Sequence, residues 1–266
     1  MLNKKIRELD AILKEMNSFV IAFSGGVDSS FLAYKATEIR GIRFVAATIR
    51  TPYIPAREIQ DAVDFCQLYD IKHKIIDIEI PDNIKEVPPE RCYLCKMQLF
   101  GKLKEYAGKN NYAFVIDGTN SDDNGDFRPG IRALRELQIR SPLQEVGFMK
   151  NEIREASKSA GLNTWDKPAY ACLLTRLPYN TKVTENDLKM IEEAEQYLFN
   201  RGFYGTRVRL HGDIARIECM PGYINKIAND PERSSIIGHL KGIGFRFISL
   251  DLEGYRTGSM DNDKHD

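Results

Sequence analysis

The stretch FVIAFSGGVDSSFLAYKA, Phe19 to Ala36, decides the fold of this chain. An apolar run reads as a buried strand, Ser-Gly-Gly-Val-Asp-Ser-Ser follows it, and a helix is predicted from Ser29. In an open parallel sheet, ligands bind beyond the carboxyl ends of the strands, where a helix N-terminus offers free N–H groups. Glycines let backbone amides approach a phosphate closely, and serine hydroxyls add short donors. We therefore predict a phosphate-binding loop for ATP made of Ser24, Gly25, Gly26, Ser29 and Ser30.

Asp28 lies in the middle of this loop. A carboxylate is a poor direct ligand for phosphate but a good ligand for Mg²⁺, so we assign Asp28 a catalytic role as the magnesium ligand. The loop is not a Walker A motif, because it lacks the Gly-Lys-Ser/Thr ending. A plain Gly-Gly turn with a serine cap is the alternative, and the order of strand, loop and helix disfavours it.

Lys plus Arg and Asp plus Glu each number 38 in the 266 residues, so the formal net charge is zero. Balanced charge offers no field for a polyanion such as RNA or for a membrane surface, and we expect neither as a partner. The N-terminus is not a basic-then-apolar leader, and no apolar run approaches the roughly 20 residues needed to span a bilayer. We therefore expect a cytoplasmic protein whose five cysteines are thiols or metal ligands rather than disulfides.

Predicted strands and helices alternate from the N-terminus to about Pro178. This alternation predicts an α/β fold, a doubly wound parallel sheet with helices on both faces. After residue 178 the pattern changes to a helix over 185–199, two strands, one further helix and a last strand. We therefore divide the chain into a nucleotide-binding domain, 1–178, and a small α+β domain, 179–266, for substrate binding or oligomerisation.

Two further segments end predicted strands and should face the same crevice as the loop. Thr48 lies near the end of the second strand, and DGTN, Asp117 to Asn120, ends a later one. Taken alone, DGTN also fits a plain turn. The four histidines show no ligand spacing, and we predict no site role for them.

The motif RCYLC places Cys92 and Cys95 one helical turn apart, a chelating separation, and Cys172 follows much later in KPAYACLLTR. Cys66 and Cys219 align with apolar residues and are predicted core thiols. A structural zinc would need four ligands, whereas three suit a [4Fe-4S] cluster with one iron left open. A redox pair or incidental thiols remain the alternative for the first two cysteines.

The loop resembles the SGGxDS signature of the PP-loop, or N-type, ATP pyrophosphatases. The resemblance implies that ATP is cleaved between its α and β phosphates, that AMP is transferred to an acceptor oxygen, and that pyrophosphate leaves from the loop. It also implies that Thr48, Gly118 and Thr119 border the adenosine of bound ATP.

Longer motifs resemble the LarE family of ATP-dependent sulfur transferases over nearly the whole chain. They are RCYLCK, DGTNSDDNGDFRPG, RSPL, WDKPAYACLLTRLPY, RVRLHGDIARIE and LEGYRTGSM. The resemblance implies that ATP adenylates a carboxylate of pyridinium-3,5-biscarboxylic acid mononucleotide. Sulfur then displaces AMP to leave a thiocarboxylate, a step in building the nickel-pincer nucleotide cofactor of lactate racemase. Adenylation turns the carboxylate oxygen into a leaving group, and thiolate or sulfide is a strong nucleophile near neutral pH.

The resemblance also bears on the source of sulfur, because the family has two versions. One keeps a single cysteine, matching Cys172, and sacrifices its sulfur, whereas the other has three cysteines and carries sulfur on a cluster. This chain has Cys92, Cys95 and Cys172. We therefore expect a [4Fe-4S] cluster recharged by an unidentified sulfur donor, and a homo-oligomeric assembly.

Three arginines are candidates for binding the anionic groups of this substrate. Arg207 and Arg209 alternate on a predicted strand and so share one face, where guanidinium groups suit the substrate phosphate. Arg176 lies four residues after the last of the three cysteines, and we give it a catalytic role in orienting the second carboxylate. The alternative for each is a solvated surface arginine. Glu195 and Glu218 match family positions near the active site or its metal.

Other functions remain compatible with parts of the sequence. A PP-loop tRNA thiolase combines this loop with cysteines, but the balanced charge disfavours a tRNA partner. An amide-forming relative such as NAD or GMP synthetase would have no need of the cysteines. A non-catalytic ATP-binding sensor is compatible with the loop alone.

Overall fold

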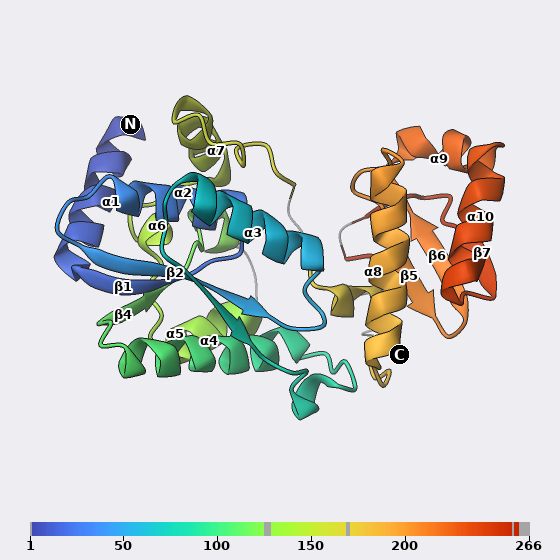
Figure 1. Ribbon diagram of the computed structural model, residues 1–266, viewed down its shortest axis with the longest axis horizontal. Helices are drawn as coiled ribbons and strands as arrows, with labels where there is room; N and C mark the ends of the chain where they lie inside the picture. The colour runs from blue at the N-terminus through green and yellow to red at the C-terminus, as the bar shows by residue number, and fades with distance from the viewer. Residues whose placement is uncertain (1, 125–128, 169–170, 257, 261–266) are drawn as a thin grey trace. The chain divides into compact units, whose positions relative to one another are not determined.

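The computed structural model describes residues 2–124, 129–168, 171–256 and 258–260. Parts of three quoted motifs, namely 125–128, 169–170 and 257, and also His265 lie outside these described residues. The chain divides into two compact units, the first Met1–Pro81 with Glu90–Ala169 and the second Asp82–Pro89 with Tyr170–Asp266 (Figure 1).

This division differs from the predicted boundary at residue 178. The physical reason is local: Arg176 forms a two-point ion pair with Glu195 on the long helix α8 (Glu185–Asn200) of the second unit. The segment that carries Cys172 and Arg176 therefore folds with the second unit rather than with the nucleotide-binding one.

Four parallel strands form the sheet of the first unit in the order β3-β2-β1-β4. Their bounds are β1 Ser18–Ala22, β2 Arg43–Arg50, β3 His73–Asp77 and β4 Phe114–Ile116. Along β1, Phe19 and Ile21 enter one hydrophobic core and Val20 enters the other, as the alternation of side chains along a strand requires.

Helices cover both faces of this sheet (Figure 1). On the Phe19 face they are α1 Leu2–Met16, α2 Val27–Thr37, α3 Ala56–Leu68, α6 Pro142–Glu145 and α7 Lys150–Ser159; on the Val20 face they are α4 Arg91–Lys109 and α5 Pro129–Glu136. The prediction of a doubly wound α/β fold is confirmed.

The order of the strands determines where the sheet of the first unit has its topological switch point. The chain runs outward from β1 through β2 to β3 and then returns to β4 on the other side of β1, so the topological switch point lies between β1 and β4. Ligands bind at such a point in doubly wound folds. The Ser24–Ser30 loop follows β1 and the DGTN segment follows β4, so both predicted segments lie at this crevice.

The second unit is a smaller α+β unit. Its sheet has the order β5-β6-β7, antiparallel between β5 and β6 and parallel between β6 and β7. The bounds of its elements are β5 Arg207–His211, β6 Ile214–Glu218, β7 Phe247–Leu250, α8 Glu185–Asn200, α9 Pro221–Ala228 and α10 Glu232–Ile243. Two helices, α9 and α10, stand where the sequence predicted one, because Pro231 separates them.

One face of the second sheet is apolar and the other is ionic. The residues Val208, Leu210, Ala215 and Ile217 are buried on the apolar face. The opposite face carries Arg207, Arg209, Arg216 and Glu218. Among the described helices of both units, every one is too short or too polar to span a bilayer.

Candidate active site

The Ser24–Ser30 loop is built so that backbone N–H groups are exposed to a ligand. Gly25 has φ +67°, and a Cβ there would lie 3.0 Å from the Cα of Ala62 on α3, so both conformation and space require glycine. α2 begins at Val27, two residues earlier than predicted, and its N-cap Gly26 provides no side-chain cap. The first-turn N–H groups are thus available for an anion.

A cavity of about 330 Å³ opens beside this loop. The predicted residues that line it are Ser24, Gly26, Asp28, Ser29, Thr48, Gly118 and Thr119, and its apolar wall includes Ile49, Ile54, Ile59, Leu99, Phe100 and Leu103. The predicted Gly25 and Ser30 are buried in the loop and do not belong to this lining. One polar end and one apolar end suit a nucleotide, with phosphates at the loop and a base against the aliphatic side chains.

The DGTN segment passes directly over the loop. A Cβ on Gly118 would lie 2.9 Å from the backbone N of Ser29, so only glycine permits this approach. Asp117 holds the segment, since its Oδ1 accepts a hydrogen bond from Ser141 Oγ at 2.6 Å and its Oδ2 one from Thr119 Oγ1 at 2.5 Å. The plain-turn alternative does not account for these close contacts.

Asp28 has one paired and one unpaired carboxylate oxygen. Its Oδ2 accepts a hydrogen bond from Lys150 Nζ at 2.5 Å, whereas Oδ1 is buried and has no hydrogen-bond partner in the described part of the chain. Burial raises the pKa of Asp28 above its ordinary value, Lys150 opposes this rise, and the charge of nearby Asp123 adds to it. Asp123 lines the same cavity. An oxygen without a partner in an acidic, phosphate-facing pocket fits the donor chemistry of Mg²⁺.

Thr48 contributes to the wall of the cavity through a buried hydrogen bond. Its Oγ1 donates to the carbonyl oxygen of Phe23 at 2.8 Å and lies 2.8 Å from His73 Nε2. Burial lowers the pKa of His73, so this imidazole stays neutral near physiological pH. We predicted no role for His73 from the sequence. Its contact with Thr48 arises because β3, which begins at His73, pairs with β2 in the sheet.

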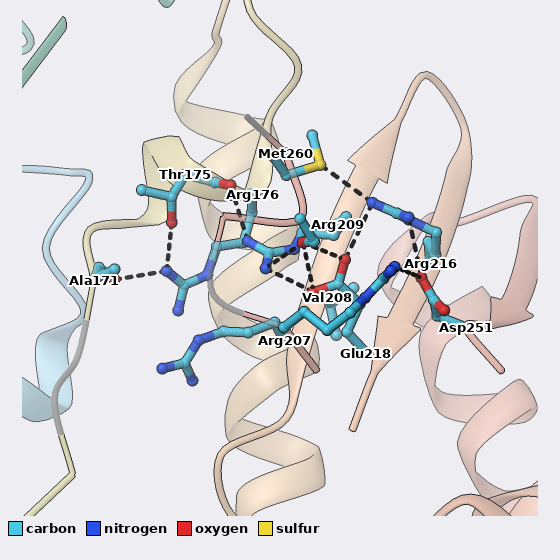
Figure 2. Close-up of polar contacts among 12 residues, drawn as sticks. Ala171, Thr175, Arg176, Arg207, Val208, Arg209, Arg216, Glu218, Asp251 and Met260 are labelled. Atoms are coloured by element: carbon cyan, nitrogen blue, oxygen red, sulfur yellow. Dashed lines mark hydrogen bonds and ion pairs between the residues drawn. The ribbon is translucent and has the colours of Figure 1, made fainter. Parts of the chain in front are cut away.

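Arg209, on the ionic face of the second sheet, is committed to an internal ion pair (Figure 2). Its Nη2 lies 2.6 Å from Glu218 Oε2, and the Glu218 side chain is fully buried. Arg216 Nη2 lies 3.1 Å from the other oxygen of Glu218, and Ser259 Oγ donates to the same carboxylate. Glu218 therefore neutralises Arg209, which reduces its attraction for a substrate phosphate.

Arg207 is in a different electrostatic position. Its residue is 6% exposed, and its guanidinium points away from Glu218 in Figure 2. Burial, and next the like charge of Arg176, lower the pKa of Arg207. The charge of Glu195 partly offsets the repulsion between the two guanidinium groups, and a bound anion would offset it further. Of the two arginines predicted to bind phosphate, Arg207 is the one whose surroundings favour an anion.

The guanidinium of Arg176 makes hydrogen bonds within the second unit. Its Nε and Nη2 each donate to Glu195 at 2.9 Å, and its Nη1 donates to the carbonyl oxygens of Ala171 and Cys172 at 2.6 and 3.0 Å. The side chain is 1% exposed. Arg176 thus holds the backbone around Cys172, with Glu195 as its partner. Its contact with the second carboxylate of the substrate stays a prediction.

The five cysteines fall into two classes. Cys66 and Cys219 are buried, and burial raises the pKa of Cys66 to about 12, so the prediction that they are core thiols is confirmed. Cys92 is exposed, and Cys95 and Cys172 are partly exposed. Cys95 Sγ lies 3.3 Å from the hydroxyl oxygen of Tyr53.

The three accessible cysteines belong to different units. Cys92 and Cys95 lie in the first two turns of α4 in the first unit, and Cys172 precedes the short 3-10 helix η3 (Leu173–Arg176) in the second unit. Among the described residues, no group of three or more His, Cys, Asp or Glu side chains is arranged to hold a metal ion. Joint ligation by the three cysteines stays a prediction.

The chain is similar in sequence to a known family model and to several known proteins. A family model described as NAD synthase matches residues 2–90, which contain the loop and the first three strands. The pyridinium-3,5-bisthiocarboxylic acid mononucleotide synthase of Lactiplantibacillus plantarum, a LarE protein, is 33% identical over 257 residues, 96% of this chain and 92% of the synthase. The chain belongs to the LarE family. Two uncharacterized relatives match as fully: one from Synechocystis sp. (37% identical, 98% of each chain) and one from Methanocaldococcus jannaschii (38% identical, 96% of this chain, 98% of the relative).

Membership of the LarE family settles the class of protein. The characterised relative is a synthase, and the loop is that of the PP-loop family, so the chain is an ATP-dependent enzyme rather than a sensor. The resemblance drawn from the longer motifs is confirmed.

The two cysteine classes of this LarE protein predict different reactivity toward a maleimide. In native, cluster-free protein near neutral pH, Cys92, Cys95 and Cys172 should be alkylated rapidly. Cys66 should resist, because burial both blocks access and raises its pKa to about 12, which leaves almost no thiolate. Peptide mass spectrometry after timed labelling measures this, with denatured protein as the control in which all five react. Rapid labelling of Cys66 in the native state would contradict the assignment.

Proposed function

We propose that this enzyme uses ATP to convert a carboxylate of pyridinium-3,5-biscarboxylic acid mononucleotide into a thiocarboxylate, releasing AMP and pyrophosphate. The proposal rests on the relative whose name gives the bisthiocarboxylic acid mononucleotide as product. The single observation that carries the ATP chemistry is the cavity of about 330 Å³ in which the loop, Asp28 and DGTN converge.

In the first step a carboxylate oxygen of the substrate attacks the α phosphorus of ATP, the bond to the β phosphate breaks, and pyrophosphate leaves. The N–H groups at the start of α2 and the hydroxyls of Ser24 and Ser29 would hold the leaving phosphates. Asp28 would hold Mg²⁺, with Asp123 close by, and the ion would neutralise charge on the phosphates. The aliphatic wall of the cavity would receive the adenine.

In the second step a sulfur nucleophile attacks the adenylated carbonyl carbon and AMP leaves with the oxygen. We propose that Cys92, Cys95 and Cys172 hold a [4Fe-4S] cluster for this step. What supports this proposal is that these three thiols are accessible, whereas the other two are buried. When bound, the cluster would supply sulfide as the nucleophile, so that the polypeptide is not consumed. Arg176 and Glu195 would keep the backbone at Cys172 in a fixed conformation.

Arg207 would bind the substrate's phosphate, whereas Arg209 would stabilise the fold. Alanine variants of the two arginines should therefore have different effects. Arg207→Ala should weaken binding of the acceptor about tenfold to a hundredfold, the worth of a charge-assisted hydrogen bond, with ATP affinity unchanged. Arg209→Ala should lower the melting temperature, because it removes the main partner of the fully buried Glu218. Calorimetric titration and thermal melts measure both; equal losses of acceptor affinity without loss of stability would contradict the distinction.

The reaction itself is tested by one anaerobic assay. The full chain is mixed with ATP, Mg²⁺ and the biscarboxylic acid mononucleotide, and AMP, pyrophosphate and the thiocarboxylate are quantified. We expect AMP and pyrophosphate in equal amounts, and we expect both to form only when the acceptor is present. We further propose that the enzyme acts in the cytoplasm as a homo-oligomer and receives sulfur from a separate donor protein or small molecule.

A further inference from the structure

The phosphate-binding loop contains no lysine between Ser24 and Ser30. Negative charge develops on the departing pyrophosphate as the α–β bond breaks, and a fixed cation beside it would lower that barrier. Among the described residues, the amino groups of Lys150 and Lys167 reach the loop although both are more than a hundred residues away in sequence. Their surroundings assign them different roles.

Lys167 is a structural support of the loop. Its Nζ donates to the carbonyl oxygen of Gly25 at 3.0 Å and lies 2.6 Å from Asp61 Oδ2 on α3. The side chain is 15% exposed, so this amino group is held between two partners. It fixes the positive-φ conformation of Gly25 and has little freedom to bind a ligand.

Lys150 is anchored through its backbone, and its side chain is more exposed than that of Lys167. It is the first residue of α7, and its N–H donates to Asp122 Oδ2 at 2.7 Å. Ser121 N donates to Phe148 O at 2.8 Å, which ties the start of α7 to the segment that follows DGTN. These bonds position the Lys150 side chain, which is 32% exposed, with its Nζ on Asp28 Oδ2.

This pairing conflicts with the proposed role of Asp28 as a magnesium ligand. An ammonium group that donates a hydrogen bond to Oδ2 at 2.5 Å repels a divalent cation bound to the same carboxylate. Binding of Mg²⁺ to Asp28 would therefore release the ammonium of Lys150. The phosphate oxygens that arrive with the same Mg²⁺ would then accept hydrogen bonds from the Lys150 ammonium. Its positive charge would therefore stay paired with a negative one.

We propose that Lys150 supplies the cation missing from the loop: on binding of Mg²⁺-ATP its amino group moves from Asp28 to the β and γ phosphates and stabilises the departing pyrophosphate. This inference rests on the proposed function of the site. It assigns Lys150 to contact the leaving group and leaves the adenosine end of the cavity to other residues. Loss of Lys150 therefore affects pyrophosphate and AMP differently.

The experiment uses Lys150→Met in the full chain, with Lys158→Met as a matched control because Lys158 is an exposed lysine on the same helix. Isothermal titration with Mg²⁺-pyrophosphate and, separately, with AMP is the readout. Lys150→Met should weaken pyrophosphate binding about tenfold to a hundredfold and leave AMP binding unchanged, whereas Lys158→Met changes neither. Lys150→Arg, which keeps the charge, should retain most of the pyrophosphate affinity.

Two results would overturn the inference. If Lys150→Met binds pyrophosphate like the wild type, Lys150 is only a partner of Asp28. If it loses pyrophosphate and AMP affinity equally, together with melting temperature, the residue supports the fold. Failure of the proposed function looks different, because the wild type itself would then fail to bind Mg²⁺-pyrophosphate or would yield ADP from ATP.

Discussion

Asp28→Ala should abolish cleavage of ATP to AMP and pyrophosphate, with a loss of turnover of about a thousandfold or more, as expected when a catalytic metal ligand is removed. The buried Oδ1 has no hydrogen-bond partner among the residues that the structure describes, and it is the oxygen that we assign to Mg²⁺. Lys150 loses its carboxylate partner in this variant. Because both groups are partly exposed, the fold should survive, and a thermal melt checks this.

Asp28→Asn sharpens the test, because it keeps size and hydrogen bonding and removes the charge that attracts Mg²⁺. It should be nearly as inactive as Asp28→Ala. Asp64→Asn, an exposed aspartate on α3, serves as the control and should retain wild-type turnover. The products are separated by chromatography. Substantial AMP formation by Asp28→Ala, or ADP as the main product of the wild type, would contradict the assignment of this loop.

Replacing Cys92, Cys95 or Cys172 with serine should each eliminate the [4Fe-4S] cluster and the transfer of sulfur, while adenylation of the substrate continues. Three thiolates are the proposed ligands, and a hydroxyl is a much weaker ligand for iron. Adenylation depends on the separate loop at Ser24 to Ser30, so pyrophosphate release should persist in all three variants. Cys66→Ala is the matched control, because this thiol is buried in the first core.

The measurement is anaerobic reconstitution with iron and sulfide, followed by Mössbauer spectroscopy and intact-protein mass determination before and after a single turnover. The expected result is a [4Fe-4S] spectrum in the wild type and in Cys66→Ala, with an unchanged polypeptide mass. If the wild type takes up no cluster and Cys172 loses the mass of hydrogen sulfide during turnover, the sulfur comes from Cys172 itself. That outcome would reject the cluster and retain the adenylation step.

Part of the site was predictable because its signals are local in sequence. The SGGVDSS loop joins a buried strand to a helix, and the strand order β3-β2-β1-β4 then brings it beside DGTN at the switch point. The contrast between buried and accessible cysteines was predictable for a similar reason. Cys66 keeps helical spacing with apolar neighbours on α3, whereas Cys92 and Cys95 lie at the N-terminus of α4.

Tertiary structure alone decided how charges are paired. Lys150 meets Asp28 across 122 residues, and no local pattern records that contact. Arg207 and Arg209 share a strand face as the alternation predicts, yet Glu218 on the neighbouring strand neutralises only the second of them.

The amino-acid sequence by itself determined the family, the alternation that makes the fold and the loop that accepts phosphate, because strand, turn and helix signals act within a few residues of one another. The boundary between the units and the partner of each buried charge depended on the folded chain. A buried ion is stable only beside its counter-charge, and which counter-charge comes near is set by how sheets and helices pack rather than by distance along the sequence. Arg176 illustrates this: its position after Cys172 suggested a role in orienting the substrate, and only the folded chain shows its two-point bond to Glu195 and its support of the backbone at Cys172.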